Sequence, residues 1–312
     1  MNRCKYEGEI KEYITKNQFK YLESMGYKFS QKLGEGSYGA VFLGSFYDNL
    51  VACKLQCLKD TLRNTRSVYV REITILKKLR HEHLVEIYNI YLFDEMLMYI
   101  MEYAPYGDLE DLIINYCTGL PEEQCARYYK QIGSGLKYFH NNGFAHCDIK
   151  PNNILLTEGR QICKITDYSL SQYCFDFRTG NPKGSYRLKT TKPFQPPEGF
   201  LPVSRAINPQ KLDIWSMAIL LFMCLNGARY PFEISKPLFR IVDDMKKPEE
   251  IIWYNTKVSR EARRFTLRHL IFIPENRPEM KDLLNDRWLD LAHGFVVRPI
   301  NLVEKFHKVL YS

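Results

Sequence analysis

The pattern of apolar and polar positions divides the chain into a strand-rich part followed by a helix-rich part. Between Phe29 and Met101, apolar and polar residues mostly alternate, as expected of half-buried strands. The alternating runs predict strands at 39–46, 50–56 and 97–101.

One stretch in this part, 67–79, instead repeats its apolar residues with the helical period. Glu72 falls on the apolar stripe, one turn from both Val68 and Leu76. A carboxylate that faces inward needs a partner.

From Pro121 onward, long helices are predicted. A proline at the helix start and two acids in the first turn precede a helical set of apolar positions. These positions are Cys125, Tyr129, Ile132, Leu136 and Phe139, and Gly143 is a suitable C-terminal stop. Two short apolar runs, 154–156 and 162–165, then predict a hairpin, and helices resume after 193. An amphipathic segment, 301–310, closes the chain.

The simplest architecture is α+β, with a small β-rich lobe at about 29–102 joined to a larger helical lobe at about 105–289. Residues 1–28 form an N-terminal extension, and 290–312 are expected to be a C-terminal helical tail. Ligands prefer the cleft between two such lobes. Whether the extension packs on the small lobe or binds an activator is open.

Composition excludes several classes of protein. A length of 312 residues with 45% hydrophobic content can bury a large core. The net charge of +8 arises from 44 basic and 36 acidic residues mixed along the chain, which favours an ordinary surface over a specific nucleic-acid site. Nine irregularly spaced cysteines indicate a reduced intracellular chain, cytoplasmic or nuclear. No signal peptide or membrane span is predicted.

The run 34–39 has the spacing G-x-G-x-x-G, which lets a backbone turn approach phosphates closely. A dinucleotide-binding motif would continue into a helix, but the residues after Gly39 keep the strand pattern. The run is therefore interpreted as a strand–turn–strand flap. The next strand places Ala52 and Lys54 on one face, so Lys54 is the natural partner for Glu72, although a surface lysine would give the same pattern.

The stretch 146–153 carries three chemically useful groups within six residues. Asp148 can accept a hydroxyl proton, Lys150 can neutralise a moving phosphoryl group, and Asn153 can offer a neutral oxygen to a metal. Asp167, at the end of the next strand, supplies a hard oxygen ligand for Mg²⁺.

In these motifs and their order, residues 29–289, about five-sixths of the chain, resemble the protein kinase family. The resemblance implies an ATP site with Mg²⁺, in which Asp148 and Lys150 are catalytic and Asn153 and Asp167 bind metal. The implied nucleotide site comprises Leu33, Gly34, Gly36, Gly39, Val41, Ala52, Lys54, Glu72, Glu102, Ala104 and Asp108.

Lys150 and Thr191 resemble the serine/threonine branch of that family, so the implied partner is a protein substrate, with an activating subunit as an open possibility. The family resemblance also pairs Glu198 with Arg277. Three features depart from the family pattern: Cys147, the run Asp167-Tyr168-Ser169 in place of the usual Asp-Phe-Gly, and the segment 167–198, which is 32 residues long. Cys147 stands where many members have an arginine for an activation-loop phosphate, which suggests activity without loop phosphorylation. Ser169 replaces the glycine after Asp167 and Tyr168, and favours fewer loop conformations.

The segment 167–198 also carries Arg178, Lys183, Arg187, Lys189 and Lys192, so either an acidic partner or a solvated loop fits. The main alternative function is a pseudokinase or allosteric scaffold that binds nucleotide or a partner but transfers phosphate weakly. Retention of every ionisable residue of the implied site favours the enzyme.

Overall fold

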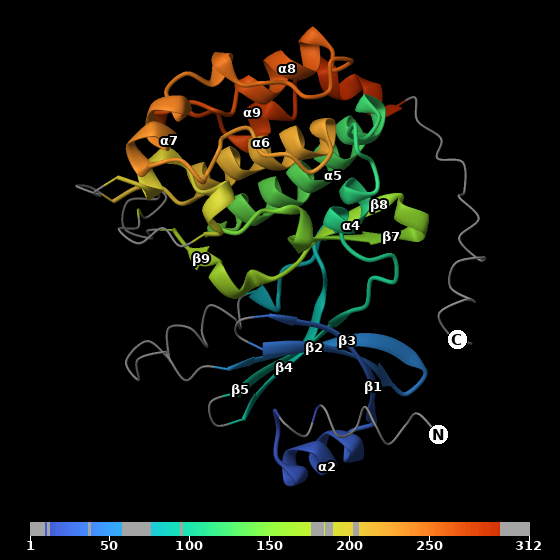
Figure 1. The fold of residues 1–312 in the computed structure, drawn as a ribbon. Helices are drawn as coiled ribbons and strands as arrows, with labels where there is room; N and C mark the ends of the chain where they lie inside the picture. Colours follow the sequence, from blue (N-terminus) through green and yellow to red (C-terminus); the bar gives the residue numbers. More distant parts are fainter. Residues whose placement is uncertain are drawn as a thin grey trace.

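A computed structural model describes residues 10, 13–36, 39–57, 76–93, 96–175, 184, 190–201 and 206–293. A five-stranded antiparallel sheet forms one lobe and a helical region forms the other, which confirms the predicted α+β architecture (Figure 1).

The sheet has the strand order β1-β2-β3-β5-β4. Its strands are β1 (Tyr27–Gly36), β2 (Gly39–Phe46), β3 (Asn49–Cys57), β4 (Ile87–Phe93) and β5 (Met96–Glu102). The three predicted strands are confirmed as β2, β3 and β5. Strand β4 was not predicted, because six of its seven residues are large and apolar or aromatic in an almost continuous run, which hides the period of two.

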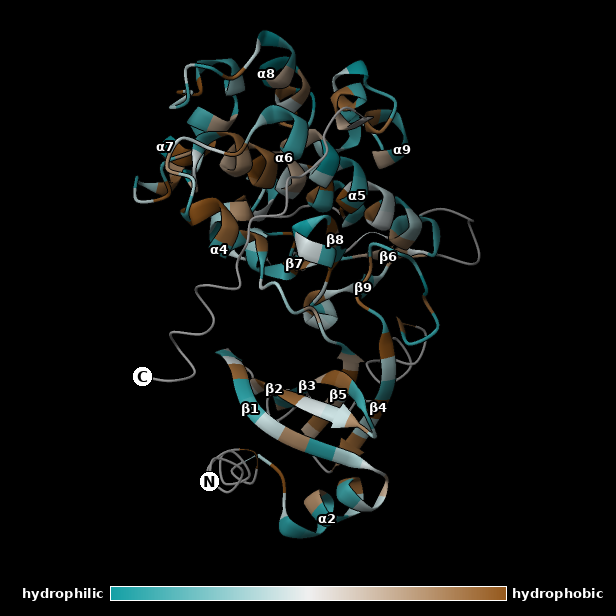
Figure 2. Ribbon diagram, turned by 90° about the vertical axis from the view of Figure 1, so that its right-hand side faces the viewer, coloured by the Kyte–Doolittle hydropathy of each residue, from teal (hydrophilic) through white to brown (hydrophobic). Residues whose placement is uncertain are grey.

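The two faces of the sheet are covered differently. Val51, Cys53 and Leu55 of β3 are buried on the outer face, beneath helix α2 (Lys16–Ser24). Ala52 joins the core shared with the helical lobe. Helix α2 lies on the side of the sheet away from the helical lobe, so at least this part of the N-terminal extension packs on the small lobe (Figures 1 and 2).

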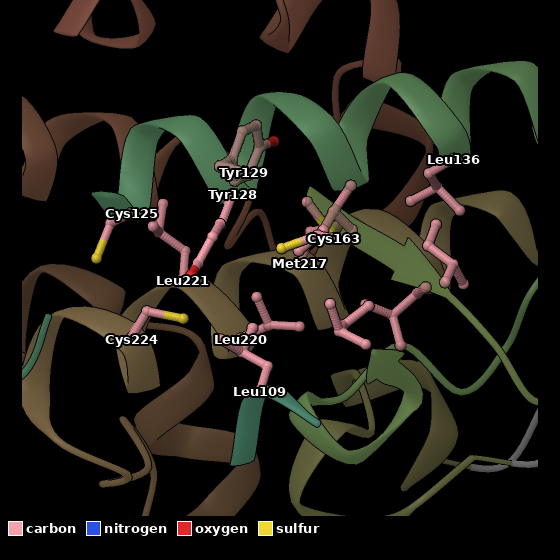
Figure 3. Close-up of a cluster of buried hydrophobic side chains, with 14 of the residues drawn as sticks. Leu109, Cys125, Tyr128, Tyr129, Leu136, Cys163, Met217, Leu220, Leu221 and Cys224 are labelled. Atoms are coloured by element: carbon pink, nitrogen blue, oxygen red, sulfur yellow. The ribbon is translucent and has the colours of Figure 1, made fainter. Parts of the chain in front are cut away.

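The helical lobe is built around two buried helices, α5 (Glu122–Asn141) and α6 (Gln210–Asn226). All five predicted apolar positions of α5 are buried, and Gly143 follows the helix with a φ of 80°, as expected of a glycine stop. Figure 3 shows side chains of α5 and α6, such as Cys125 and Leu221, meeting Cys163 in one core. The other helices are α4 (Leu109–Ile114), α7 (Leu238–Met245), α8 (Arg260–Leu267) and α9 (Met280–Leu283).

Short strands complete this lobe. The predicted hairpin is confirmed as β7 (Ile154–Thr157) and β8 (Ile162–Ile165), while β6 (Phe144–Ala145) pairs with β9 (Gln172–Tyr173). Residue Ile165 joins the lobes: its carbonyl accepts from the Val85 N–H at 2.8 Å, and its own N–H donates to the His83 carbonyl at 2.9 Å. Short 3₁₀ segments lie at Pro151–Asn153, Glu158–Arg160, Tyr168–Leu170, Lys192–Phe194, Pro197–Gly199, Pro248–Glu250, Pro274–Asn276 and Arg287–His293.

Several predictions lie outside the described residues. The helix predicted at 67–79 is described only from Leu76, so Glu72 is not placed. The amphipathic segment 301–310 and four of the five basic residues named in the loop after Asp167 are likewise outside. Within the described ranges, no helix combines the length and apolar character required to cross a bilayer.

Candidate active site

The glycine flap is the hairpin of β1 and β2. Glu35 pairs with Ala40, and Gly36 with Gly39, while the two residues at the tip lie outside the described part. At Gly39 an added Cβ would lie 1.8 Å from the Leu55 carbonyl oxygen, so packing of β2 on β3 itself requires glycine there. At Gly34 an added Cβ would meet nothing within 4 Å. Two further residues of the implied nucleotide site flank the flap glycines: Leu33 of β1, which is 40% exposed, and Val41 of β2, which packs on the main core.

Lys54 reaches from the sheet to the helical lobe. Its ammonium forms an ion pair with the carboxylate of Asp167, which follows β8. Burial raises the pKa of Asp167, but the charge and hydrogen bond of Lys54, together with bonds from Ser169, outweigh it and lower the pKa to about 2. Asp167 is therefore ionised at neutral pH. The pairing of Lys54 with Glu72 stays a prediction.

Asp148 lies in a loop after β6 and is 4% exposed. Its Oδ2 accepts from Lys150 Nζ at 2.8 Å and Asn153 Nδ2 at 2.9 Å, and its Oδ1 accepts from the Thr191 hydroxyl at 2.7 Å. Burial raises the pKa of Asp148, yet the hydrogen bonds from Lys150 and Thr191 outweigh this and hold it below the usual range. The four side chains thus form one network around an ionised carboxylate.

Asp213, in the first turn of α6, holds the same loop from behind. The buried carboxylate accepts from the backbone N–H groups of His146, at 2.8 Å, and Cys147, at 2.7 Å. His140 Nε2 lies 2.9 Å from the Oδ2 atom. Because Cys147 has a φ of 67°, which is unusual for a residue with a side chain, this anchoring helps to maintain a strained turn next to Asp148.

Asn153 and Asp167 are connected through the backbone, since the N–H of Thr166 donates to the Asn153 carbonyl at 2.9 Å. The Asn153 amide nitrogen is occupied by Asp148, which leaves its side-chain oxygen as the group available to a cation. One carboxylate and one amide oxygen suit Mg²⁺, which usually takes its other ligands from phosphates and water. The described residues contain no cluster of three or more His, Cys, Asp or Glu side chains suited to a metal.

The link between the lobes contains Glu102, Ala104 and Asp108. The Glu102 carboxylate is paired with Lys164 of β8 at 2.8 Å. Asp108 caps α4 by accepting from the Asp111 N–H at 2.9 Å, and burial raises the pKa of Asp108. Ala104 lies between them in a segment outside the helices and strands, so its backbone groups are not committed to either element.

The residues after Asp167 are tied down more tightly than their sequence indicated. The Tyr168 hydroxyl lies 3.1 Å from the Val85 carbonyl and 3.0 Å from the Ile165 carbonyl, so its single proton is shared between two acceptors. The Tyr168 ring stacks on Phe139, with centroids 5.7 Å apart. The Tyr168 hydroxyl is thus a second restraint on the conformations of this loop, besides Ser169. The phenylalanine that is usual at this position in the family would lack it.

Cys147 is fully buried in a small apolar cluster with Ala145 and Cys174, and Leu170 packs against it. Burial raises the pKa of the Cys147 thiol well above its usual range, so this position carries no charge. The predicted pairing of Glu198 and Arg277 is present as a buried bidentate ion pair, with N–O distances of 2.7 and 2.6 Å.

Sequence reasoning missed three features of this site. It did not assign a role to Asp213, although a carboxylate in the first turn of a helix that is mostly apolar from there on is a signal that could have found it. It also missed the bond from the Tyr168 hydroxyl and the pairing of Lys164 with Glu102. Neither pair has a local sequence signature, because their partners are separated by 83 and 62 residues.

Comparison with known proteins agrees with this geometry. The family model "Protein kinase domain" matches residues 27–289. Among curated proteins, the chain is 29% identical over 316 residues to "Probable serine/threonine-protein kinase RTK1" of Saccharomyces cerevisiae, covering 94% of this chain and 49% of that protein.

Two further relatives have the same type of name. The chain is 30% identical to "Probable serine/threonine-protein kinase MARK-A" of Dictyostelium discoideum, over 87% of this chain and 25% of that protein. It is 29% identical to "Ovarian-specific serine/threonine-protein kinase Lok" of Drosophila melanogaster, over 84% of this chain and 56% of that protein. The chain thus spans between a quarter and just over half the length of these relatives.

Proposed function

The chain belongs to the protein kinase family, and from that premise we propose that it transfers the γ-phosphoryl group of Mg-ATP to serine and threonine hydroxyls of protein substrates. The observation that carries the proposal is the network in which Lys150, Asn153 and Thr191 surround the ionised Asp148 carboxylate. Families that transfer phosphate to hydroxyls depend mainly on such positioning and charge.

In this proposal each residue has a defined role. Asp148 orients the substrate hydroxyl and accepts its proton, and Lys150 stabilises negative charge on the moving phosphoryl group. Asn153 and Asp167 would hold Mg²⁺, which supplies charge neutralisation of the phosphates when bound. Lys54, freed from Asp167 or shared with it, would contact the α- and β-phosphates and pair with Glu72.

The proposed nucleotide site lies where the lobes meet. The adenine ring would lie between Leu33, Val41 and Ala52, with the backbone of Glu102 and Ala104 at its edge. Asp108 would meet the ribose. The phosphates would lie under the flap glycines, Gly34, Gly36 and Gly39.

We further propose that activity does not need phosphorylation of the loop after Asp167. A buried, uncharged Cys147 packed against Cys174 supports this, because a phosphate on the loop would find no cation at that position. Phosphatase-treated protein should keep its activity. An inactive phosphate-free sample that regains activity on phosphorylation of Ser185 or Thr190 would contradict the proposal.

An intracellular location is part of the same proposal. All eight cysteines among the described residues are free thiols, which suits a reducing compartment. Assay of the purified chain alone tests whether an activating subunit is needed and which protein substrates the chain accepts.

The test is transfer of labelled phosphate from Mg-ATP to a mixed serine, threonine and tyrosine peptide set. Asp148→Asn should lower kcat by about 10² to 10⁴-fold with nucleotide affinity retained. Asp243→Asn, an exposed carboxylate of α7, is the matched control and should leave kcat unchanged. Label on serine and threonine supports the proposal. Nucleotide binding with no transfer by the unmodified chain favours the scaffold alternative.

A further inference from the structure

The segment before the sheet is firmly attached to the strand lobe. Ile10, Ile14, Phe19 and Leu22 are each at most 4% exposed and lie in one core cluster with Phe42 of β2. Burial of four large apolar side chains stabilises this attachment, because their apolar surface is removed from water. The segment is therefore part of the folded lobe.

A capping box determines how the chain enters α2. The Thr15 hydroxyl accepts from the Gln18 N–H at 3.3 Å, and the Gln18 side chain accepts from the Thr15 N–H at 2.8 Å. With Ile14 buried beside the cap, the direction of the preceding residue, Tyr13, is also defined.

Tyr13 reaches the glycine flap. Its ring meets Phe42 edge-on, with centroids 5.9 Å apart, and its hydroxyl donates to Glu35 Oε1 at 2.9 Å. Glu35 is the residue between the first two flap glycines, Gly34 and Gly36. Its other carboxylate oxygen is paired with Lys32 of the same strand.

The stem of the flap is irregular at this place. The pairing of β1 with β2 shifts register between Phe29 and Lys32 and again between Lys32 and Gly34, so the stem of the hairpin is irregular just before Glu35. Within the hairpin, Lys32 steadies the carboxylate from inside. Tyr13 adds a contact from a separate segment, and hydrogen bonds from Lys32 and Tyr13 hold the pKa of Glu35 below its usual range.

We propose that Tyr13 is a positioning residue that, through Glu35, holds the glycine flap in the arrangement that binds nucleotide. The inference rests on the proposed use of ATP. It goes beyond the family features, because Tyr13 precedes residues 27–289, which the family model matches. The apparent affinity for nucleotide decreases when fewer molecules have the flap in its binding arrangement. Nucleotide binding in turn strengthens the contact of Tyr13 with the flap.

The test is Tyr13→Phe, which keeps the ring on Phe42 and removes only the hydroxyl. The expected result is a rise of about three- to tenfold in the Kd for Mg-ADP, measured by titration calorimetry, as expected for one hydrogen bond to a charged acceptor near the surface. The KM for ATP should rise equally, while kcat and the KM for peptide stay within about twofold.

Tyr21→Phe is the matched control. Tyr21 is on the same segment, is 49% exposed and meets Tyr91, and its hydroxyl has no hydrogen bond within the described residues. Its Kd should equal that of the unmodified protein. Glu35→Ala should raise the Kd at least as much as Tyr13→Phe, and combining the two changes should add no further rise. Glu35→Gln keeps an acceptor for Tyr13 and should recover part of the affinity.

Three results would overturn the inference. The first is an unchanged Kd for Tyr13→Phe, and the second is full additivity of Tyr13→Phe with Glu35→Ala. The third is a loss of kcat and thermal stability without a selective change in nucleotide affinity. Because Mg-ADP binding is measured without turnover, a chain that binds nucleotide but transfers no phosphate refutes the proposed function and leaves this test decisive.

Discussion

Replacing Asp213 with asparagine should weaken both the fold and the catalytic loop. The side chain has no exposed surface, and its two oxygens accept from the backbone N–H groups of His146 and Cys147. Asparagine has almost the same shape but only one acceptor oxygen. In either orientation of the amide, one of the two backbone N–H groups must therefore face an NH₂ group.

The magnitude follows from these contacts. One orphaned buried N–H costs about 1–3 kcal/mol, and the remaining bond loses its charged acceptor, which adds about 1 kcal/mol. The expected loss in the free energy of unfolding is about 2–4 kcal/mol. His140→Leu removes only the third partner and keeps both backbone bonds, so its cost should be about 1 kcal/mol.

Urea unfolding followed by tryptophan fluorescence measures this loss, since Trp215, Trp253 and Trp288 all lie in the helical lobe. Asp243→Asn, which breaks only an exposed pair with Lys246, is the control and should change stability by less than about 0.5 kcal/mol. At equal folded fraction, kcat of Asp213→Asn should fall about 10²-fold because the loop that holds Asp148 is displaced. A change below about 0.5 kcal/mol with unaltered kcat would refute the anchoring role.

Three further results are expected. Tyr168→Phe removes one shared hydrogen bond, worth about 1 kcal/mol, so amide exchange of 167–171 should be about fivefold faster; unchanged exchange would show that the hydroxyl does not restrain the loop. Burial lowers the pKa of His269 to about 4. Between pH 6.5 and 4 the imidazole is therefore protonated in the unfolded state but neutral in the folded state, so stability falls as the pH is lowered through that range. His269→Gln should reduce this dependence on pH by up to about 1.4 kcal/mol per pH unit. Urea unfolding at pH 7 and pH 4.5 measures it, and an equal loss of unfolding free energy in the variant and the unmodified protein would count against this role of His269. Arg277→Met should cost about 3–5 kcal/mol by leaving Glu198 buried and unpaired. Adding Glu198→Leu should then partly restore the temperature of thermal unfolding, and a double variant no more stable than Arg277→Met would exclude that cause.

Local patterns predicted the elements whose signal lies in neighbouring residues. The apolar stripe of α5 and its glycine stop, the hairpin of β7 and β8, and the strands on either side of the flap were all legible, because periodicity and turn residues act within a few positions. Helix α2 and strand β4 were not, because α2 is short and mostly polar and β4 has no clear alternation.

The same division holds for the site. The sequence alone determined which functional groups the site contains, because Asp148, Lys150, Asn153 and Asp167 lie in two short motifs whose order and spacing are informative. Their common network with Thr191 required the folded chain to bring together residues about 40 positions apart.

Only the tertiary structure decided which distant groups hold those motifs in place. Asp213 meets its loop across 66 residues, the pair of Cys147 and Cys174 fills a buried corner, and Tyr13 reaches the flap from a segment before the sheet. Such pairings depend on how whole elements pack, and packing complementarity leaves no periodic trace in the sequence.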